Sequence, residues 1–269
     1  MAGGVSLRRH EKLNEFMTHG GHSRIAFLCL LALWSARSDG QPAGNLPRGE
    51  TLHYTVEWKF ITAGRATLRW TGQPSGGWQT ALRIESAGLV SKLFKVQDEY
   101  SSSLGPNLCA SGSQMSASEG SRRRETRIVY NRETLKAHYL ERDLVKNSVA
   151  LEKEIDIPPC VHDIVGALYQ LRTLSLEPGQ SVQLPLSDGK KSVSARIEAQ
   201  AREEIRTPAG ARKTVRYEVF VFNNALYQRP WRVFLWLTDD REKVPVQIRV
   251  RLQLHIGTIT LLLEKEERS

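Results

Sequence analysis

The segment from Val246 to Ile256 alternates strictly between apolar and polar side chains. Its apolar members are Val246, Ile248, Val250, Leu252, Leu254 and Ile256, and its polar members are Gln247, Arg249, Arg251, Gln253 and His255. Successive side chains of a β-strand point to opposite faces, so this pattern predicts a long strand with one buried and one solvated face. A chain built on such strands must bury the apolar face that they share.

The same two-residue period recurs from residue 51 onward, separated by turns rich in Gly, Pro, Asp and Ser. We expect roughly eleven to thirteen strands and two short helices. The fourteen candidate segments, of which 107–119 is a weaker one, lie near 51–60, 65–70, 78–84, 96–100, 107–119, 125–131, 134–141, 146–154, 181–186, 191–200, 212–222, 231–238, 244–256 and 258–265. The expected helices lie at 89–94 and 161–173, where apolar residues follow helical spacing.

Consecutive amphipathic strands joined by short turns predict a mainly β fold with one shared core. We expect a single antiparallel, partly open β-barrel or strongly curved sheet, with a sandwich as the alternative and the two helices as plug or lid. A barrel of about ten or more strands is too wide for strand side chains alone to fill. Helices therefore plug the interior or a ligand cavity remains. Residues 51–265 are expected to form this one domain, after a linker at 41–50.

Residues 1–40 have the pattern of a secretory signal peptide. Ile25 to Trp34 is a ten-residue apolar run, preceded by Arg24 and followed by small or polar residues. Such a run is shorter than a transmembrane helix requires. The true start of translation could be Met17, because the residues after it form an ordinary basic leader. We expect export to the periplasm or cell envelope, and retention of the segment as a membrane anchor is the alternative.

The chain is basic, with 38 Lys and Arg against 29 Asp and Glu. Nucleic acid or anionic lipid headgroups could meet such a surface, but export argues against nucleic acid as a partner. The basic residues alternate along strands and form no block, so a solvated outer face is the default interpretation. Peripheral contact with a membrane remains open.

Two cysteines, Cys109 and Cys160, lie beyond the signal segment. In an oxidising compartment they could form a disulfide, and two buried free thiols are the alternative. A bond closing a loop of this size would contribute roughly 3–4 kcal/mol in the chain-entropy model. Their spacing matches no zinc or redox motif. Leu28 stands before Cys29 where a lipobox needs a small residue, so Cys29 is interpreted as part of the apolar leader.

Several motifs together resemble one bacterial exported family. They are YTVEWKFITAGRATL, LVSKLFKVQDEYSSSL, CVHDIVGALYQLR, TPAGARKT, WLTDDREKVPVQIRV and GTITLLLE. The chain is similar over residues 50–265 to the family called domain of unknown function 3108. The recurrent positions of that family fall on Gly64, Asp98, Asp163, Leu168, Tyr169, Arg172, Pro208, Gly210, Trp236, Asp240 and Pro245.

The resemblance implies a build like that of periplasmic lipoprotein-carrier half-barrels, which hold acyl chains in an apolar concavity. It implies no catalytic activity, because none is established for the family. The resemblance at the level of the fold does not by itself fix a function.

No group of residues predicts catalysis, a metal or a cofactor. His162 and Asp163 are neighbours in the expected helix and do not face each other, and an acidic residue in the first turn favours the helix dipole. Asp239 and Asp240 are typical turn residues, and a hard cation is the weaker alternative. The chain has no GxSxG, no HExxH and no phosphate-binding glycine loop. We expect a protein that is not an enzyme.

The first functional hypothesis is a binding module for a lipid or other hydrophobic molecule inside the curved sheet. The residues expected to contact that ligand are Trp58, Phe60, Trp70, Leu82, Leu168, Tyr169, Arg172 and Trp236. Tyr169 and Arg172 could hold a headgroup at the cavity mouth, or they could form only packing and a salt bridge. The alternative is a structural or interaction protein of envelope assembly, with a fully packed interior and an envelope protein as partner. A hydrolase comes third, because it needs convergent polar groups.

Overall fold

The structure, a computed structural model, describes residues 46–220, 232–252 and 257–269, all of which belong to one compact unit spanning Asp39–Ser269. The expected signal segment and Cys29 lie outside the described residues. None of the helices in these ranges is long and apolar enough to cross a membrane.

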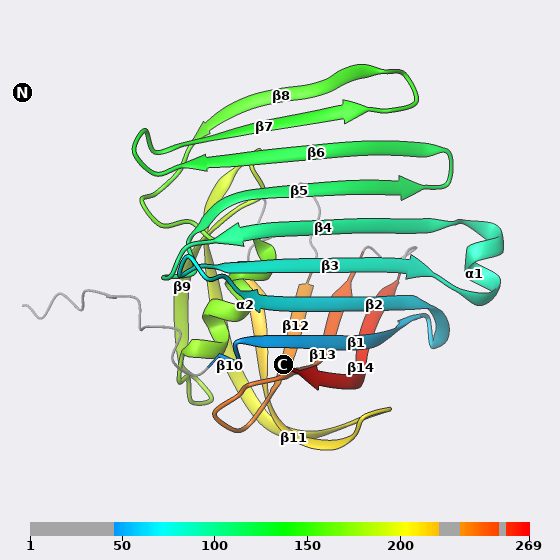
Figure 1. Cartoon of the computed structure of the whole chain (residues 1–269). Coiled ribbons are helices and arrows are strands. Elements are labelled where there is room, and N and C mark those ends of the chain that lie inside the picture. The colour runs from blue at the N-terminus through cyan, green and yellow to red at the C-terminus, as the bar shows by residue number, and fades with distance from the viewer. Residues whose placement is uncertain (1–45, 221–231, 253–256) are drawn as a thin grey trace, which may run out of the picture. The chain divides into compact units, whose positions relative to one another are not determined.

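The described residues form a sheet of fourteen antiparallel strands in the order β8-β7-β6-β5-β4-β3-β2-β1-β14-β13-β12-β11-β10-β9 (Figure 1). The first wall of the sheet contains β1(Gly49–Trp58), β2(Ile61–Gly72), β3(Trp78–Ser86), β4(Val96–Leu104), β5(Ala110–Glu119), β6(Arg122–Asn131), β7(Lys136–Asp143) and β8(Ser148–Asp156). The second wall contains β9(Ser181–Ser187), β10(Ser192–Thr207), β11(Gly210–Phe220), β12(Arg232–Thr238), β13(Pro245–Arg251) and β14(Thr258–Arg268). Pairing between β1 and β14 joins the walls.

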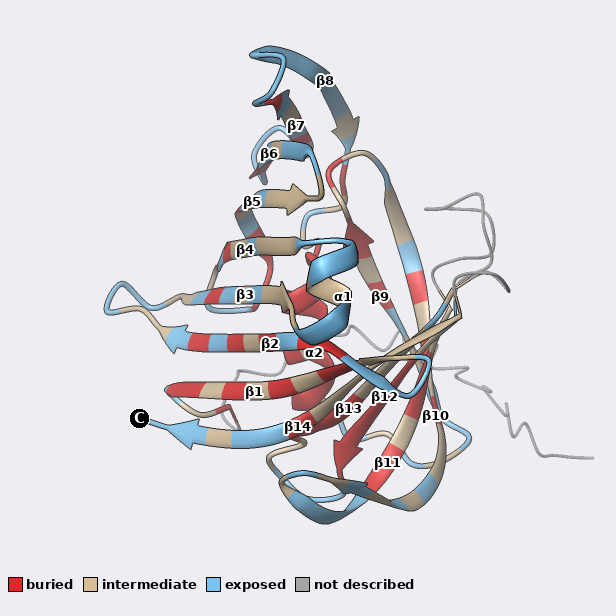
Figure 2. Cartoon of the chain, turned by 90° about the vertical axis from the view of Figure 1, so that its right-hand side faces the viewer, coloured by how far each residue is buried: buried red, intermediate tan, exposed pale blue. Residues whose placement is uncertain are grey.

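Two short helices lie at opposite ends of the angle between the walls. Helix α2(Ile164–Thr173) packs inside one end, and α1(Gly88–Leu93) lies at the other. Figure 2 looks into this angle with α1 in front and α2 behind. Asp163 begins α2 by accepting a hydrogen bond on Oδ1 from the Gly166 amide at 2.7 Å, which is N-capping. Eight of the ten residues of α2 are buried and none of α1 is.

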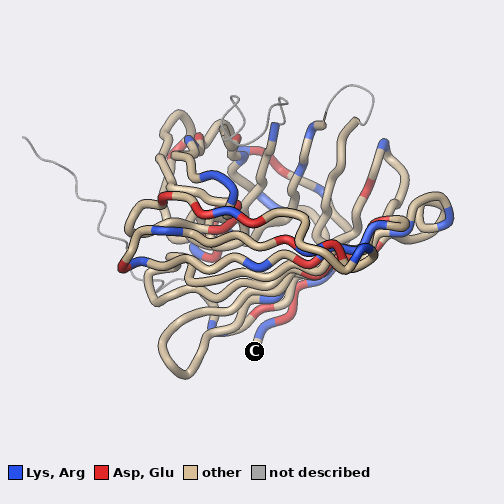
Figure 3. The backbone as a smooth tube through the Cα atoms, turned by 90° about the horizontal axis from the view of Figure 1, so that it is seen from above, with Lys and Arg blue, Asp and Glu red and all other residues tan. Residues whose placement is uncertain are grey.

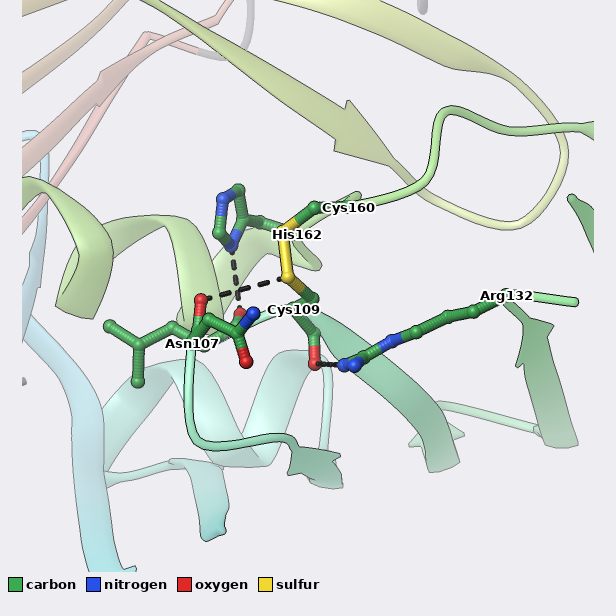
Figure 4. The surroundings of a disulfide bond; sticks show 6 residues. Asn107, Cys109, Arg132, Cys160 and His162 are labelled. Carbon is green, nitrogen blue, oxygen red and sulfur yellow. Dashed lines mark hydrogen bonds between the residues drawn. A yellow bond between two sulfur atoms is a disulfide. The ribbon is translucent and has the colours of Figure 1, made fainter. Parts of the chain in front are cut away.

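The chain between β8 and α2 links the two walls at the α2 end. The Val161 carbonyl accepts from the Ala110 amide at 2.8 Å, and His162 forms a parallel bridge with Leu186 of β9. Cys109 and Cys160 form a disulfide, which joins this segment to the loop before β5 (Figure 4). The sheet is therefore tied across at the α2 end, although β8 and β9 are not paired along their length.

The hairpin between β9 and β10 adds a contact at the same end. Gly189 at its tip has a φ of +79°, and an added Cβ there would lie 2.8 Å from the Ile128 side chain of β6. The Tyr130 hydroxyl donates to the Ser187 carbonyl at 3.2 Å. Glycine at residue 189 meets two needs, because the turn requires a positive φ and the first wall is close.

The expected mainly β, partly open fold with two short helices is confirmed, and the sandwich is excluded by the single continuous sheet. One turn was placed wrongly. The expected strands near 51–60 and 65–70 put the first hairpin turn at residues 62–64, but the chain turns at Lys59 and Phe60, whose φ values are 48° and 69°. Gly64 lies inside β2, where an added Cβ would meet the Glu85 carbonyl oxygen at 2.2 Å. Close approach of β3 therefore explains this glycine.

Candidate functional site

The α2 end of the concave face is packed solid. Trp70 is fully buried and stacks on Tyr169 of α2, with ring centroids 3.8 Å apart, and on Trp78 of β3 at 4.6 Å. On the opposite side of α2, Leu171 packs against Tyr217 and Leu235 of the second wall. Helix α2 therefore fills the space that two bent walls would otherwise leave open at this end.

A buried ion pair fixes α2 to the first strand. Arg172 binds both carboxylate oxygens of Glu50 in β1, and its Nη2 lies 3.1 Å from Oε2. The Tyr169 hydroxyl donates to Glu50 Oε1 at 2.8 Å, and Arg172 Nε donates to the Glu242 carbonyl at 3.2 Å. Burial alone would lower the pKa of Arg172, but the hydrogen bonds and the charge of Glu50 outweigh it and raise the pKa. The guanidinium is therefore a structural cation.

A polar row separates α2 from the rest of the concave face. Thr80 of β3 and Ser102 of β4 share a hydrogen bond of 2.8 Å, and both are buried. Asp163 is also buried, and its Oδ2 has no hydrogen-bond partner within the part of the chain that the structure describes. Burial raises the pKa of Asp163, so the carboxyl favours its neutral form more than an exposed aspartate does.

His162 belongs to the closure at the α2 end. Its Nδ1 lies 2.8 Å from the Leu108 carbonyl oxygen, which can only accept, so Nδ1 carries the proton (Figure 4). Burial lowers the pKa of His162, with the Leu108 hydrogen bond acting against it. His162 and Asp163 each bond to backbone groups in different directions. No group of three or more metal-ligating side chains occurs among the described residues.

Beyond the polar row, the concave face continues as a strip of half-buried apolar side chains, which we call the open strip. Its members are Trp58, Leu82, Ile84, Tyr100, Met115, Ile248, Val250, Ile259 and Leu261. The register places them side by side: Leu82 opposes Tyr100, and Ile248 opposes Leu261. The open strip thus spans both walls and leads from the polar row toward the α1 end.

The rim at the α1 end exposes large apolar side chains. Phe60 is 99% exposed, and Leu89, Leu93 and Phe94 around α1 are 65%, 76% and 53% exposed. Figure 2 shows α1 in pale blue and tan at the mouth, in contrast to the red interior around α2. Lysines 59, 92 and 95 belong to the same turns. Exposed apolar side chains gathered at one edge mark an interaction surface more often than scattered ones do.

The structure separates the residues that we expected to share one ligand site. Trp58 and Leu82 lie in the open strip, and Leu168 is half-buried between the two walls. Trp70 is fully packed under α2. Tyr169 and Arg172 are buried with Glu50 and lie at no cavity mouth.

Phe60 and Trp236 do not lie on the concave face, which corrects the sequence interpretation. The strand ends at Trp58, so the alternation that placed Phe60 inward stops before it. Trp236 pairs with Gln247 on the opposite face, where its indole Nε1 donates to Glu203 Oε1 at 2.7 Å. It is buried because the long β10–β11 hairpin folds over that face.

Sequence reasoning missed Glu50 and most of the open strip. Glu50 was assigned to the linker, although it lies in β1 and is buried. Its partner Arg172 is 122 residues away, and no local pattern connects the two. The apolar side of β13 and β14 was visible in the alternation, and Ile248, Val250 and Ile259 could have been proposed from that signal.

A family described as "Protein of unknown function (DUF3108)" matches residues 53–264. The chain belongs to this family. No curated protein matches it significantly.

The solved structures that share its build include a β-barrel-like protein of the family DUF1849 from Brucella abortus. It is 9% identical, covers 83% of this chain and 99% of its own, and has a TM-score of 0.56. A Bacteroides fragilis protein proposed to be exported, with a YmcC-like fold, is 9% identical over 81% of this chain and 95% of its own, with a TM-score of 0.35. A Parabacteroides distasonis protein proposed to be a lipoprotein is 11% identical over 83% and 98%, with a TM-score of 0.30. The Brucella structure supports the fold alone.

Proposed function

We propose that this protein is an exported, non-catalytic protein of the bacterial cell envelope that binds a lipid or other hydrophobic molecule on the open strip. The observation that carries the proposal is the open strip, whose half-buried apolar side chains lie on β3 to β5 and, across the buried Ala66 and Leu68 of β2, on β1, β14 and β13. An acyl chain of about 14 carbons gains roughly 0.8 kcal/mol for each CH₂ that it buries. The strip offers such a chain an apolar surface on both walls.

The difference between the two ends of the concave face supports binding at the α1 end. The α2 end is filled by side chains and tied by a disulfide, so it offers no room. Ligand sites are mostly apolar with a few placed polar groups. The row of Thr80, Ser102 and Asp163 gives the inner end of the strip that polar boundary.

The rim supports contact with a membrane that would supply or receive the ligand. Phe60, Leu89 and Leu93 project from neighbouring turns together with lysines. Apolar side chains beside basic ones suit the boundary between acyl chains and anionic headgroups. The disulfide favours an oxidising compartment, which is consistent with export.

The alternative function is that of an interaction protein of envelope assembly. The packed α2 end favours this alternative, because a protein whose interior is fully packed can bind a partner only on its surface. The half-buried state of the open strip favours the ligand instead.

Native mass spectrometry on protein purified from the envelope fraction of its host tests the proposal, with extraction and identification of any bound lipid. We expect a stoichiometric hydrophobic molecule on the protein and its loss in Ile248→Ser/Leu261→Ser. Val129→Ser is the matched control, because Val129 is an exposed apolar residue on the other face of β6. A bare protein mass that persists when lipids are offered would overturn the proposal and favour a protein partner.

A further inference from the structure

A groove of about 520 Å³ lies on the convex face of β13 and β14, opposite the open strip. Alternate residues of β13 supply its floor: Gln247, Arg249 and Arg251 point to this face, while Ile248 and Val250 point to the other. Thr258 and Thr260 of β14 pair beside the two arginines. The groove is independent of the proposed ligand face because the sheet itself separates them.

The groove gathers basic charge from three separate parts of the chain. Lys59 comes from the β1–β2 turn and Arg206 from β10, and they join Arg249 and Arg251 of β13. Glu57 is the only acidic residue among those that line it in the described ranges. Across most of the sheet, in contrast, basic and acidic positions are interleaved (Figure 3).

The arginines of the groove are held in place without carboxylate partners. Arg249 stacks over Trp236 at 5.0 Å, and Arg251 lies over Phe234 at 5.4 Å. Within residues 46–220, 232–252 and 257–269, neither of them nor Arg206 forms an ion pair. Nearby arginines on the same face do: Arg216 pairs with Glu203 at 3.4 Å and Arg232 with Glu218 at 2.8 Å. Burial is the largest cause of the lowered pKa of Arg249; the charge of Arg251 adds to it, and the charges of Glu203 and Glu57 act against it.

Gln247 supplies a second, independent observation on the groove. The residue is only 4% exposed and lines the groove, and its Nε2 has no hydrogen-bond partner among the described residues. A buried donor without a partner is costly and calls for an explanation. An anion bound in the groove would neutralise the arginines, and a rotation of the Gln247 side chain toward it would give Nε2 an acceptor.

We propose that this groove binds a phosphate group, held by Arg249, Arg251 and Arg206 with Gln247 Nε2 as an additional donor. Guanidinium groups offer paired donors that match tetrahedral oxyanions, and their planar faces can stack on aromatic rings at the same time. The chemistry is shared by a phospholipid headgroup and by a soluble phosphate. Phe60 and Leu262 also line the groove and would contact the apolar part of a lipid.

Binding of inorganic phosphate by calorimetry and of vesicles by co-sedimentation tests the site. The vesicles contain phosphatidylcholine alone or with phosphatidylglycerol. We expect Arg249→Gln/Arg251→Gln to weaken phosphate-dependent binding about tenfold or more. The control Arg212→Gln/Arg241→Gln removes two exposed arginines outside the groove and should leave binding unchanged. Because Arg249 and Arg251 also pack on aromatic rings, the single variant Arg206→Gln provides a test in which folding is preserved.

Binding to phosphatidylglycerol vesicles that Arg206→Gln weakens supports the proposal with a lipid as the source of the phosphate. Binding to inorganic phosphate alone supports it with a soluble source. If neither probe binds, or if the groove variants bind as well as the control, the proposal is wrong. Those outcomes do not bear on the proposed binding of an apolar ligand, because that binding is tested with variants on the opposite face and by mass spectrometry.

Discussion

The two ends of the concave face are built from the same strands but reach opposite states. At the α2 end, a helix, a buried ion pair and a disulfide hold the two walls together. At the α1 end, the same strands carry half-buried apolar side chains, and the helix across the mouth has no buried residue. The difference teaches that the packed, stabilising contacts and the open apolar surface occupy separate ends of one sheet. Because the contacts at the α2 end hold the fold together, the strands at the α1 end need no filled interior.

The largest expected effect comes from the buried ion pair. Arg172→Met should lower the free energy of unfolding by about 3–5 kcal/mol, because it leaves the Glu50 carboxylate buried without its cation. Glu50→Leu/Arg172→Met should recover most of the loss, since no charge remains. Urea unfolding followed by tryptophan fluorescence measures both. Arg268→Met, which breaks an exposed pair with Glu242, should cost less than about 1 kcal/mol. A single variant as stable as this control would refute the role of the pair.

The disulfide should have the next largest effect. Cys109→Ala/Cys160→Ala is expected to lower stability by roughly 3–4 kcal/mol, because the bond closes a long loop in the unfolded chain. The same shift of the urea midpoint should follow reduction of the native protein. Reduction should not change the doubly substituted variant. Equal midpoints for oxidised and reduced native protein would show that the α2 end is closed without the bond.

Contact between the hairpin tip and the first wall should have a smaller effect. Gly189→Ala places a methyl group against Ile128 and should cost about 1–3 kcal/mol in overpacking and backbone strain. Gly179→Ala is the matched control, because Gly179 also has a positive φ but would meet nothing within 4 Å. Thermal unfolding measures the loss of stability in each variant. The extra loss in Gly189→Ala over Gly179→Ala gives the contribution of the contact. No excess would mean that the two walls do not press together there.

The smallest expected effect is the pH dependence carried by His162. Burial lowers the folded pKa of His162 below its ordinary value near 6.5. The unfolded chain therefore takes up a proton first as the pH falls, and the free energy of unfolding should decrease below about pH 6.5, by at most about 1.4 kcal/mol per pH unit. His162→Asn keeps a donor for the Leu108 carbonyl and should lose this slope. Asp163, whose pKa burial raises, acts in the opposite direction and is unchanged in the comparison. Parallel pH profiles would contradict the prediction.

Much of the fold could be predicted because strand alternation is a local signal. The apolar side of β13 and the short helix at α2 both follow from side-chain spacing. The tight turn at Lys59 and Phe60 could not, since neither is a typical residue for positive φ. The burial of Trp236 depends on a hairpin from elsewhere in the chain, and the Glu50–Arg172 pair joins residues 122 positions apart. The burial of Trp236 and the Glu50–Arg172 pair depend on contacts between distant parts of the chain, so no short segment of sequence predicts them.

Hydrogen–deuterium exchange of the whole protein, with and without the neutral lipid monomyristoylglycerol, tests the central claim most directly. A neutral lipid avoids the basic groove and reports on the apolar face alone. We expect slower exchange in α1 and in the ends of β3, β4, β13 and β14 nearest to it, and unchanged exchange around α2. Identical exchange in both samples, or protection confined to α2 and the strands packed on it, would contradict the account.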